Sequence, residues 1–98
     1  MTYKEETMDF KYGKNSIYCG ESESNHQAII QYTEVTPRVK NVTHTGVDKS
    51  LEGQGIAGQL VDKLVQRARE EGFKLQATCS YAKSKLEKTE DYKDVYKA

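Results

Sequence analysis

"SLEGQGIAGQLVDKLVQRAREEGFKLQATC", residues Ser50–Cys79, contains the pattern that decides the fold. Apolar residues recur through it at a helical spacing: Ile56, Ala57, Leu60, Val61, Leu64, Val65 and Ala68. Two apolar residues in every turn predict a helix that lies on a sheet, and Gly72 predicts its end. Residues 73–79 then alternate between apolar and polar, which predicts a strand. Because a helix precedes this strand, we expect it to run parallel to the strand before that helix.

The chain before this stretch predicts strands. Residues 8–13 and 15–22 are short and rich in aromatic and β-branched residues, and the residues between them suit a hairpin turn. Residues 26–35 form a third segment, which Pro37 ends because proline cannot donate to a ladder. Residues 38–47 alternate, which predicts two faces: Val39, Asn41, Thr43, Thr45 and Val47 on one, and Lys40, Val42, His44 and Gly46 on the other.

The end of the chain predicts a short polar helix that starts at a Ser80 cap, followed by a tail anchored by Tyr92 and Val95. The expected order is therefore ββββ-α-β-α, an α+β fold with a mixed, mainly antiparallel sheet. With 98 residues, we expect one domain that spans residues 1–98.

Composition excludes several classes of function. The chain has 15 basic and 15 acidic residues, so it lacks the basic surplus that nucleic-acid binding uses. Its two cysteines, Cys19 and Cys79, are too few and too far apart for a disulfide framework or a zinc site. The N-terminal residues lack a secretory pattern, and no stretch reaches membrane-spanning length. We therefore expect a cytoplasmic protein with no nucleic-acid or membrane partner, and favour a monomer.

Gly53, Gly55 and Gly58 stand at the front of the predicted helix, although glycine weakens helices. Glycines let the backbone approach a ligand closely, and the first amides of a helix attract an anion. The letters also fit G-x-G-x-x-G, but an antiparallel meander is the wrong context for a dinucleotide fold. A phosphate-binding loop is thus the favoured interpretation, and a tight strand-to-helix turn is the alternative.

Glu52–Ala57, "EGQGIA", resembles the [R/Q]-x-x-G-x-[G/A] loop of GNAT-type N-acetyltransferases, whose amides hold the pyrophosphate of coenzyme A. The pattern of His44-Thr45, this loop, Cys79 at a strand end and a tyrosine-containing C-terminal segment is similar to the small stand-alone GNAT-like proteins of the YjdJ-like group. The resemblance implies a shortened GNAT-like fold, without the elements that build an acceptor pocket in larger relatives. Glu52 departs from the pattern, so a charge-assisted contact to the pyrophosphate is missing.

The resemblance also implies site residues. Those expected to contact acetyl-CoA are Val47, Gly53, Gln54, Gly55, Ile56, Ala57, Gly58, Ser80 and Lys83. Lys83 or Lys85 is a candidate contact of the adenosine phosphate, with a solvated helix face as the alternative. Cys79 is a candidate nucleophile that takes the acetyl group, and packing or lining the site during direct transfer is its alternative. His44 is a candidate general base, and a solvent-facing strand histidine is its alternative.

The function expected from these residues is acetyl transfer from acetyl-CoA to an unidentified amine, on a small molecule or a protein. A non-catalytic module that binds coenzyme A and regulates a partner is the alternative from another class. A structural domain with a vestigial loop is the third interpretation.

Overall fold

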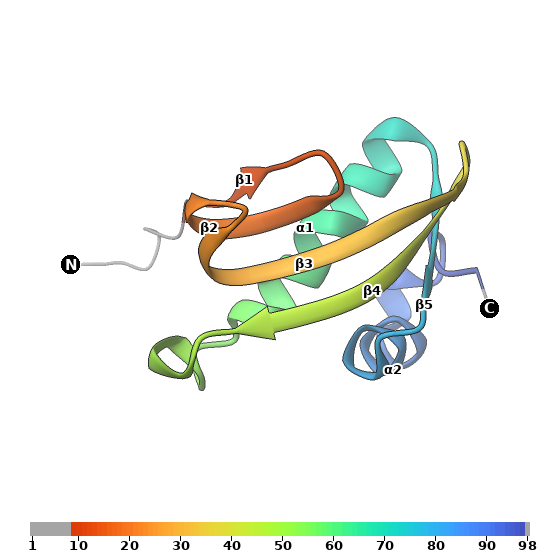
Figure 1. Cartoon of the computed structure of the whole chain (residues 1–98). Helices are drawn as coiled ribbons and strands as arrows, with labels where there is room; N and C mark the ends of the chain where they lie inside the picture. The colour runs from red at the N-terminus through yellow and green to blue at the C-terminus, as the bar shows by residue number, and fades with distance from the viewer. Residues whose placement is uncertain (1–8, 98) are drawn as a thin grey trace.

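The computed structural model describes residues 9–97, and in it two helices pack on a five-stranded sheet (Figure 1). The strands are β1 (Lys11–Tyr12), β2 (Ser16–Ser22), β3 (Asn25–Thr36), β4 (Val39–Val47) and β5 (Lys74–Ala77). The helices are α1 (Ile56–Glu71) and α2 (Ser80–Lys88), with short 3-10 turns η2 (Lys49–Leu51) and η3 (Glu90–Tyr92). The predicted α+β order is confirmed. None of the helices in the described residues is long and apolar enough to cross a membrane.

The sheet has the order β1-β2-β3-β4-β5, with antiparallel pairing up to β4. β5 runs parallel to β4, as the helical connection predicts, and pairs with it from Val39↔Lys74 to Val42↔Ala77. The first predicted strand was expected to begin at Met8, which lies outside the described residues; in the described part it is Lys11–Tyr12 alone.

A β-bulge interrupts β4 and corrects the predicted faces. Gln31 of β3 pairs with His44, and the next residue, Tyr32, pairs with Val42, so Thr43 is an extra residue on β4. Val42 is buried in the core on one side of the bulge. On the other side Thr45 pairs with the core residue Ile30 and therefore shares its face. The expected single alternation over residues 38–47 is wrong, because one extra residue exchanges the two faces.

β4 and β5 separate beyond this bulge (Figure 1). The amides of Thr78 and Cys79 both donate to the carbonyl of Val42, at 3.0 and 3.1 Å, and α2 then begins at Ser80. Within residues 9–97, the segment 43–47 of β4 consequently has a strand partner on its β3 side only. On its outward side this segment forms no ladder with another strand of the described residues.

One core lies between the helices and the sheet. α1 contributes the apolar stripe that its sequence predicts, with Ile56, Leu60, Val61, Leu64, Val65 and Ala68 buried. α2 packs beside it through Ala82 and Leu86. Tyr92 and Val95 of the C-terminal segment are buried in the same cluster, which confirms their predicted role as anchors. Each fully buried leucine, isoleucine or valine of this core contributes about 1.5–3 kcal/mol to the free energy of unfolding.

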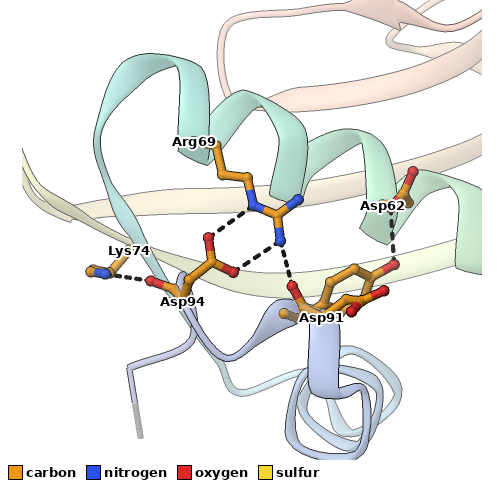
Figure 2. A network of polar contacts seen from close by, with 6 residues as sticks. Asp62, Arg69, Lys74, Asp91 and Asp94 are labelled. Atoms are coloured by element: carbon orange, nitrogen blue, oxygen red, sulfur yellow. Dashed lines mark hydrogen bonds and ion pairs between the residues drawn. The ribbon is translucent and has the colours of Figure 1, made fainter.

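The C-terminal segment is held to the end of α1 by a polar network (Figure 2). Arg69 donates from Nε and Nη2 to the two carboxylate oxygens of Asp94, at 2.9 Å each. Its Nη2 also donates to the carbonyl of Asp91, and Lys74 donates to the carbonyl of Asp94. Arg69, Lys74 and the Asp94 carboxylate therefore each have a partner in this network.

A second contact of this segment joins Tyr92 to α1. The Tyr92 hydroxyl donates to Oδ1 of Asp62 at 3.2 Å. Burial and the neighbouring Asp62 carboxylate raise the pKa of Tyr92 to about 12. Tyr96 forms a bridge with Leu75, so the chain after η3 also covers the outer edge of β5.

Candidate functional site

The loop before α1 has the backbone that its glycines predict. Gly53 and Gly55 have φ angles of +85° and +74°, in the left-handed region that side chains disfavour. A Cβ atom at either position would meet no atom within 4 Å, so the space beside both residues is open. Gly55 is the N-cap of α1, and the cost of a glycine inside a helix therefore does not apply to it. Gly58 lies within the first turn.

Among the residues that the structure describes, the first backbone amides of α1 have no hydrogen-bond partner. No side chain caps it, and its first turn has no acidic residue. The Gln59 amide, which donates to Gly55 at 3.1 Å, is the first with an intrahelical acceptor. The preceding amides and the helix dipole together place about half a positive charge here. This is the arrangement that binds phosphate groups.

A cavity of about 250 Å³ opens at this loop. It is lined by Val47, Leu51, Glu52, Gly53, Gly55, Ile56, Ala57, Gly58 and Tyr81. A neighbouring cavity of about 260 Å³ shares Tyr81 and continues along α2, past Ser84, Lys85, Lys88 and Thr89. Most of the predicted cofactor-binding residues line the first cavity; Gln54, Ser80 and Lys83 do not.

α2 presents Tyr81 and Lys85 to the first turn of α1. The Lys85 Nζ lies 3.6 Å, and the Tyr81 hydroxyl 3.7 Å, from the position that a Cβ of Gly58 would take. Lys83 lies on the other side of the buried stripe that Ala82 and Leu86 form, and it is exposed. Of the two lysines considered from the sequence, Lys85 is thus the one brought to the glycine loop.

Cys79 lies where β5 ends and α2 begins. It occupies the N-cap position, so the expected Ser80 cap is wrong; Ser80 is the first helical residue. The half-buried thiol donates to Oγ1 of Thr45 at 3.6 Å. Burial raises the pKa of the Cys79 thiol, but hydrogen bonding from the amides of Ala82 and Tyr81 and from Thr45 outweighs burial, and the pKa is lowered.

Cys19 has the opposite environment. It is buried in the core, where desolvation and the charge of Asp9 raise the pKa of its thiol despite the nearby Lys11. The two thiols therefore differ in acidity, and the more acidic one is beside the separation of β4 and β5.

His44 lies on the sheet face turned away from the helices. It pairs with the exposed Gln31, whereas its neighbour Thr45 faces the core. Its Nε2 is 2.8 Å from the position that a Cβ of Gly46 would take, so the imidazole lies over that glycine. The groups that shift the pKa of Cys79 do not include His44. The structure thus places His44 on β4 and Cys79 at the start of α2, without a contact between them in the described residues.

Comparison with known proteins gives one family. The profile of the family described as GCN5-related N-acetyl-transferase matches residues 16–95. A solution structure of a GCN5-like candidate N-acetyltransferase from Staphylococcus aureus is 42% identical, with 93% of this chain and 89% of that chain covered and a TM-score of 0.79. No curated protein matches the chain.

More distant structures share the fold. A ribosomal-protein-alanine N-acetyltransferase from Brucella melitensis is 20% identical, with 87% of this chain and 63% of that chain covered and a TM-score of 0.54. Rv2747 from Mycobacterium tuberculosis, solved in complex with CoA and NLQ, is 16% identical with a TM-score of 0.53. That match covers 65% of this chain and 40% of Rv2747.

Proposed function

The chain belongs to the GCN5-related N-acetyltransferase family, and we propose that it transfers the acetyl group of acetyl-CoA to an amine on a small molecule or a protein. One observation carries the proposal. The glycine loop opens into a cavity that Val47 of β4 also lines, and β4 leads from there to the Cys79–Thr45 contact. An anion site and an acidic thiol thus lie along one strand.

The residues present suit the parts of acetyl-CoA. The uncapped amides of α1 and the open space beside Gly53 and Gly55 fit a pyrophosphate. The outward backbone groups of residues 43–47 fit the amides of the pantetheine arm, as an added strand would. Residues 1–98 would then act as one acetyl-CoA-binding domain, with the arm directed toward Cys79.

Cys79 is proposed as the nucleophile. Bound acetyl-CoA supplies the acetyl group as a thioester. The Cys79 thiolate forms a new bond to the acetyl carbonyl carbon, while the bond from that carbon to the CoA sulfur breaks and CoA leaves as a thiolate that takes a proton. The acceptor amine then attacks the acetyl-cysteine, loses a proton and releases the Cys79 thiolate. The amides of Tyr81 and Ala82 stabilise that thiolate, since they lower the pKa of the thiol.

His44 and Thr45 have different parts in this proposal. The Thr45 hydroxyl, which accepts from the thiol, can donate to the thiolate once the proton has left. His44 is proposed as the base that takes a proton from the amine. It lies on the sheet face opposite Thr45, so the amine must reach the acetyl-cysteine where β4 and β5 separate.

Mass spectrometry of the intact protein after incubation with acetyl-CoA tests the proposal. An adduct of about 42 Da that maps to Cys79 is expected for an acetyl-cysteine, and Cys79→Ala should lack it. Cys19→Ala, which removes the other thiol, should keep it. Turnover with a panel of amines and no adduct would indicate direct transfer without Cys79. CoA binding with neither turnover nor adduct would favour the non-catalytic module.

A further inference from the structure

The anion site at the start of α1 has more positive charge than the helix alone provides. The Lys85 ammonium lies over Gly58, within the turn whose amides have no intrahelical acceptor. A cation at the positive end of a helix dipole is unfavourable, and acidic residues are the usual occupants of that position. In residues 9–97, no carboxylate forms an ion pair with Lys85. An anion that binds at this end of the helix therefore relieves the repulsion between the Lys85 ammonium and the helix dipole.

The placement of Lys85 follows from the packing of α2. Ala82 and Leu86 are buried against the core, and Tyr81 and Lys85 lie one turn apart on the flank that faces α1. Gly58 has no side chain, so the half-buried lysine can cross to the first turn of α1. Lys85 also lines the neighbouring cavity, which shares Tyr81 with the cavity at the glycine loop.

Glu52 has the opposite effect on the same site. It is the one carboxylate among the described residues that line the loop cavity, and its charge repels a phosphate. A cation from another element can offset that repulsion.

We propose that Lys85 binds the pyrophosphate of the ligand and supplies the charge-assisted contact that the acidic glycine loop lacks. This inference rests on the proposed function, because it needs CoA to bind at the loop. Two helices would then bind the pyrophosphate: α1 provides backbone amides, and α2 provides the cation. Lys85 is accordingly a binding residue for the diphosphate and takes no part in acetyl transfer.

Calorimetric titration of the full chain at low salt tests the role of Lys85. Lys85→Gln removes the charge over Gly58, and Lys83→Gln is a matched control because it removes the same charge from the exposed side of α2. We expect Lys85→Gln to lower the affinity for both CoA and dephospho-CoA by about tenfold, which is the size of one charge-assisted contact. The affinity of this variant should also depend less on salt. Lys83→Gln should leave both affinities within about twofold of the original.

The ligands separate the possible outcomes. A loss confined to CoA would place Lys85 at the 3′-phosphate, which dephospho-CoA lacks, and would overturn the assignment to the pyrophosphate. Equal affinities of the Lys85→Gln and Lys83→Gln variants would overturn it as well. If the unaltered chain binds CoA in that experiment, the inference fails while the CoA binding that the proposed function requires is upheld. If the unaltered chain binds neither ligand, the proposed function itself fails.

Discussion

The two ends of α1 handle their polar groups in opposite ways. At the C-terminal end, Gly72 closes the helix by donating to Ala68 at 2.8 Å, and Arg69 and Asp94 form a two-point ion pair. At the N-terminal end, Gly55 gives no side-chain cap, and the amides face a cavity. One end has its partners within the chain. The other end has no such partner within residues 9–97, and we propose that CoA supplies it.

The difference shows how one residue type can have two purposes. Gly55 and Gly72 flank the same helix, and both have left-handed φ angles, of +74° and +80°. The Gly72 amide closes the helix, and this interaction concerns folding. Gly55 precedes amides that have no acceptor in the helix, and we propose that its conformation serves an external anion. The same substitution at each glycine can therefore separate folding from binding.

The largest expected effect comes from this pair of glycines. Gly55→Val and Gly72→Val each force a branched side chain into a left-handed conformation, which costs about 1–3 kcal/mol of the free energy of unfolding. We expect only Gly55→Val to lower the affinity for CoA, by about a hundredfold or more, because its side chain also enters the space proposed for the pyrophosphate. Calorimetric titration and denaturant unfolding measure the two effects. Equal loss of CoA affinity in both variants would remove the distinction between the two ends.

A second prediction compares the Cys79 thiol, at the start of α2, with the Cys19 thiol in the core. The pKa of Cys79 is lowered and that of Cys19 is raised, so more of Cys79 is thiolate at neutral pH. We expect iodoacetamide to label Cys79 at least about ten times faster, and the rate for Cys79 to level off at a lower pH. Peptide mapping gives both rates, and saturating CoA should protect Cys79. Similar rates for the two thiols, with no protection, would return Cys79 to a packing role.

A third prediction changes the charge at each end of α1. Glu52→Arg places a cation at the loop cavity, and we expect CoA to bind about five- to tenfold more tightly at low salt. Glu70→Arg, which makes the same change on an exposed position near the other end, should leave the affinity unaltered. The gain from Glu52→Arg should shrink as salt is added. An unaltered affinity at low salt would mean that the side chain of residue 52 points away from the ligand.

The smallest expected effect concerns the closed end. Tyr92→Phe removes the hydrogen bond to Asp62 and should lower the free energy of unfolding by about 1 kcal/mol without changing CoA affinity. The pKa of Tyr92 is raised from 10.0 to about 12, so its contribution is complete below pH 10 and is lost as the pH rises through 12. The difference in stability between the two proteins should shrink over that range. A constant difference in denaturant unfolding would show that Tyr92 does not titrate as stated.

Local pattern predicts some of these features and not others. The α1 stripe, the parallel β5 and the anchors Tyr92 and Val95 follow from periodicity and connection rules, which need no partner. The bulge at Thr43 depends on how β3 pairs, and pairing leaves no mark in the sequence of β4 alone. That bulge turns Thr45 toward Cys79, so the Thr45 contact was not predicted.

The second helix gives the same lesson. Its buried stripe is only Ala82 and Leu86 in a polar segment, which is too weak a pattern to show which flank faces α1. The sequence therefore gave no reason to prefer Lys85 over Lys83 as the lysine near the glycine loop, and Tyr81 was not predicted to line the site. The spacing of Tyr81, Lys85 and Lys88 at i, i+4 and i+7 is the signal that places them on one flank.

Thermal unfolding with and without ligand tests most directly whether the open end of α1 binds the pyrophosphate of CoA. At a CoA concentration about a hundredfold above Kd, binding should stabilise the fold by about 2.7 kcal/mol. For a chain of this size that raises Tm by about 10 °C or more. ADP, which carries the pyrophosphate, should reproduce part of the rise, and pantetheine, which lacks it, should give almost none. An unchanged Tm at millimolar CoA, or a rise with pantetheine equal to that with CoA, would contradict the account.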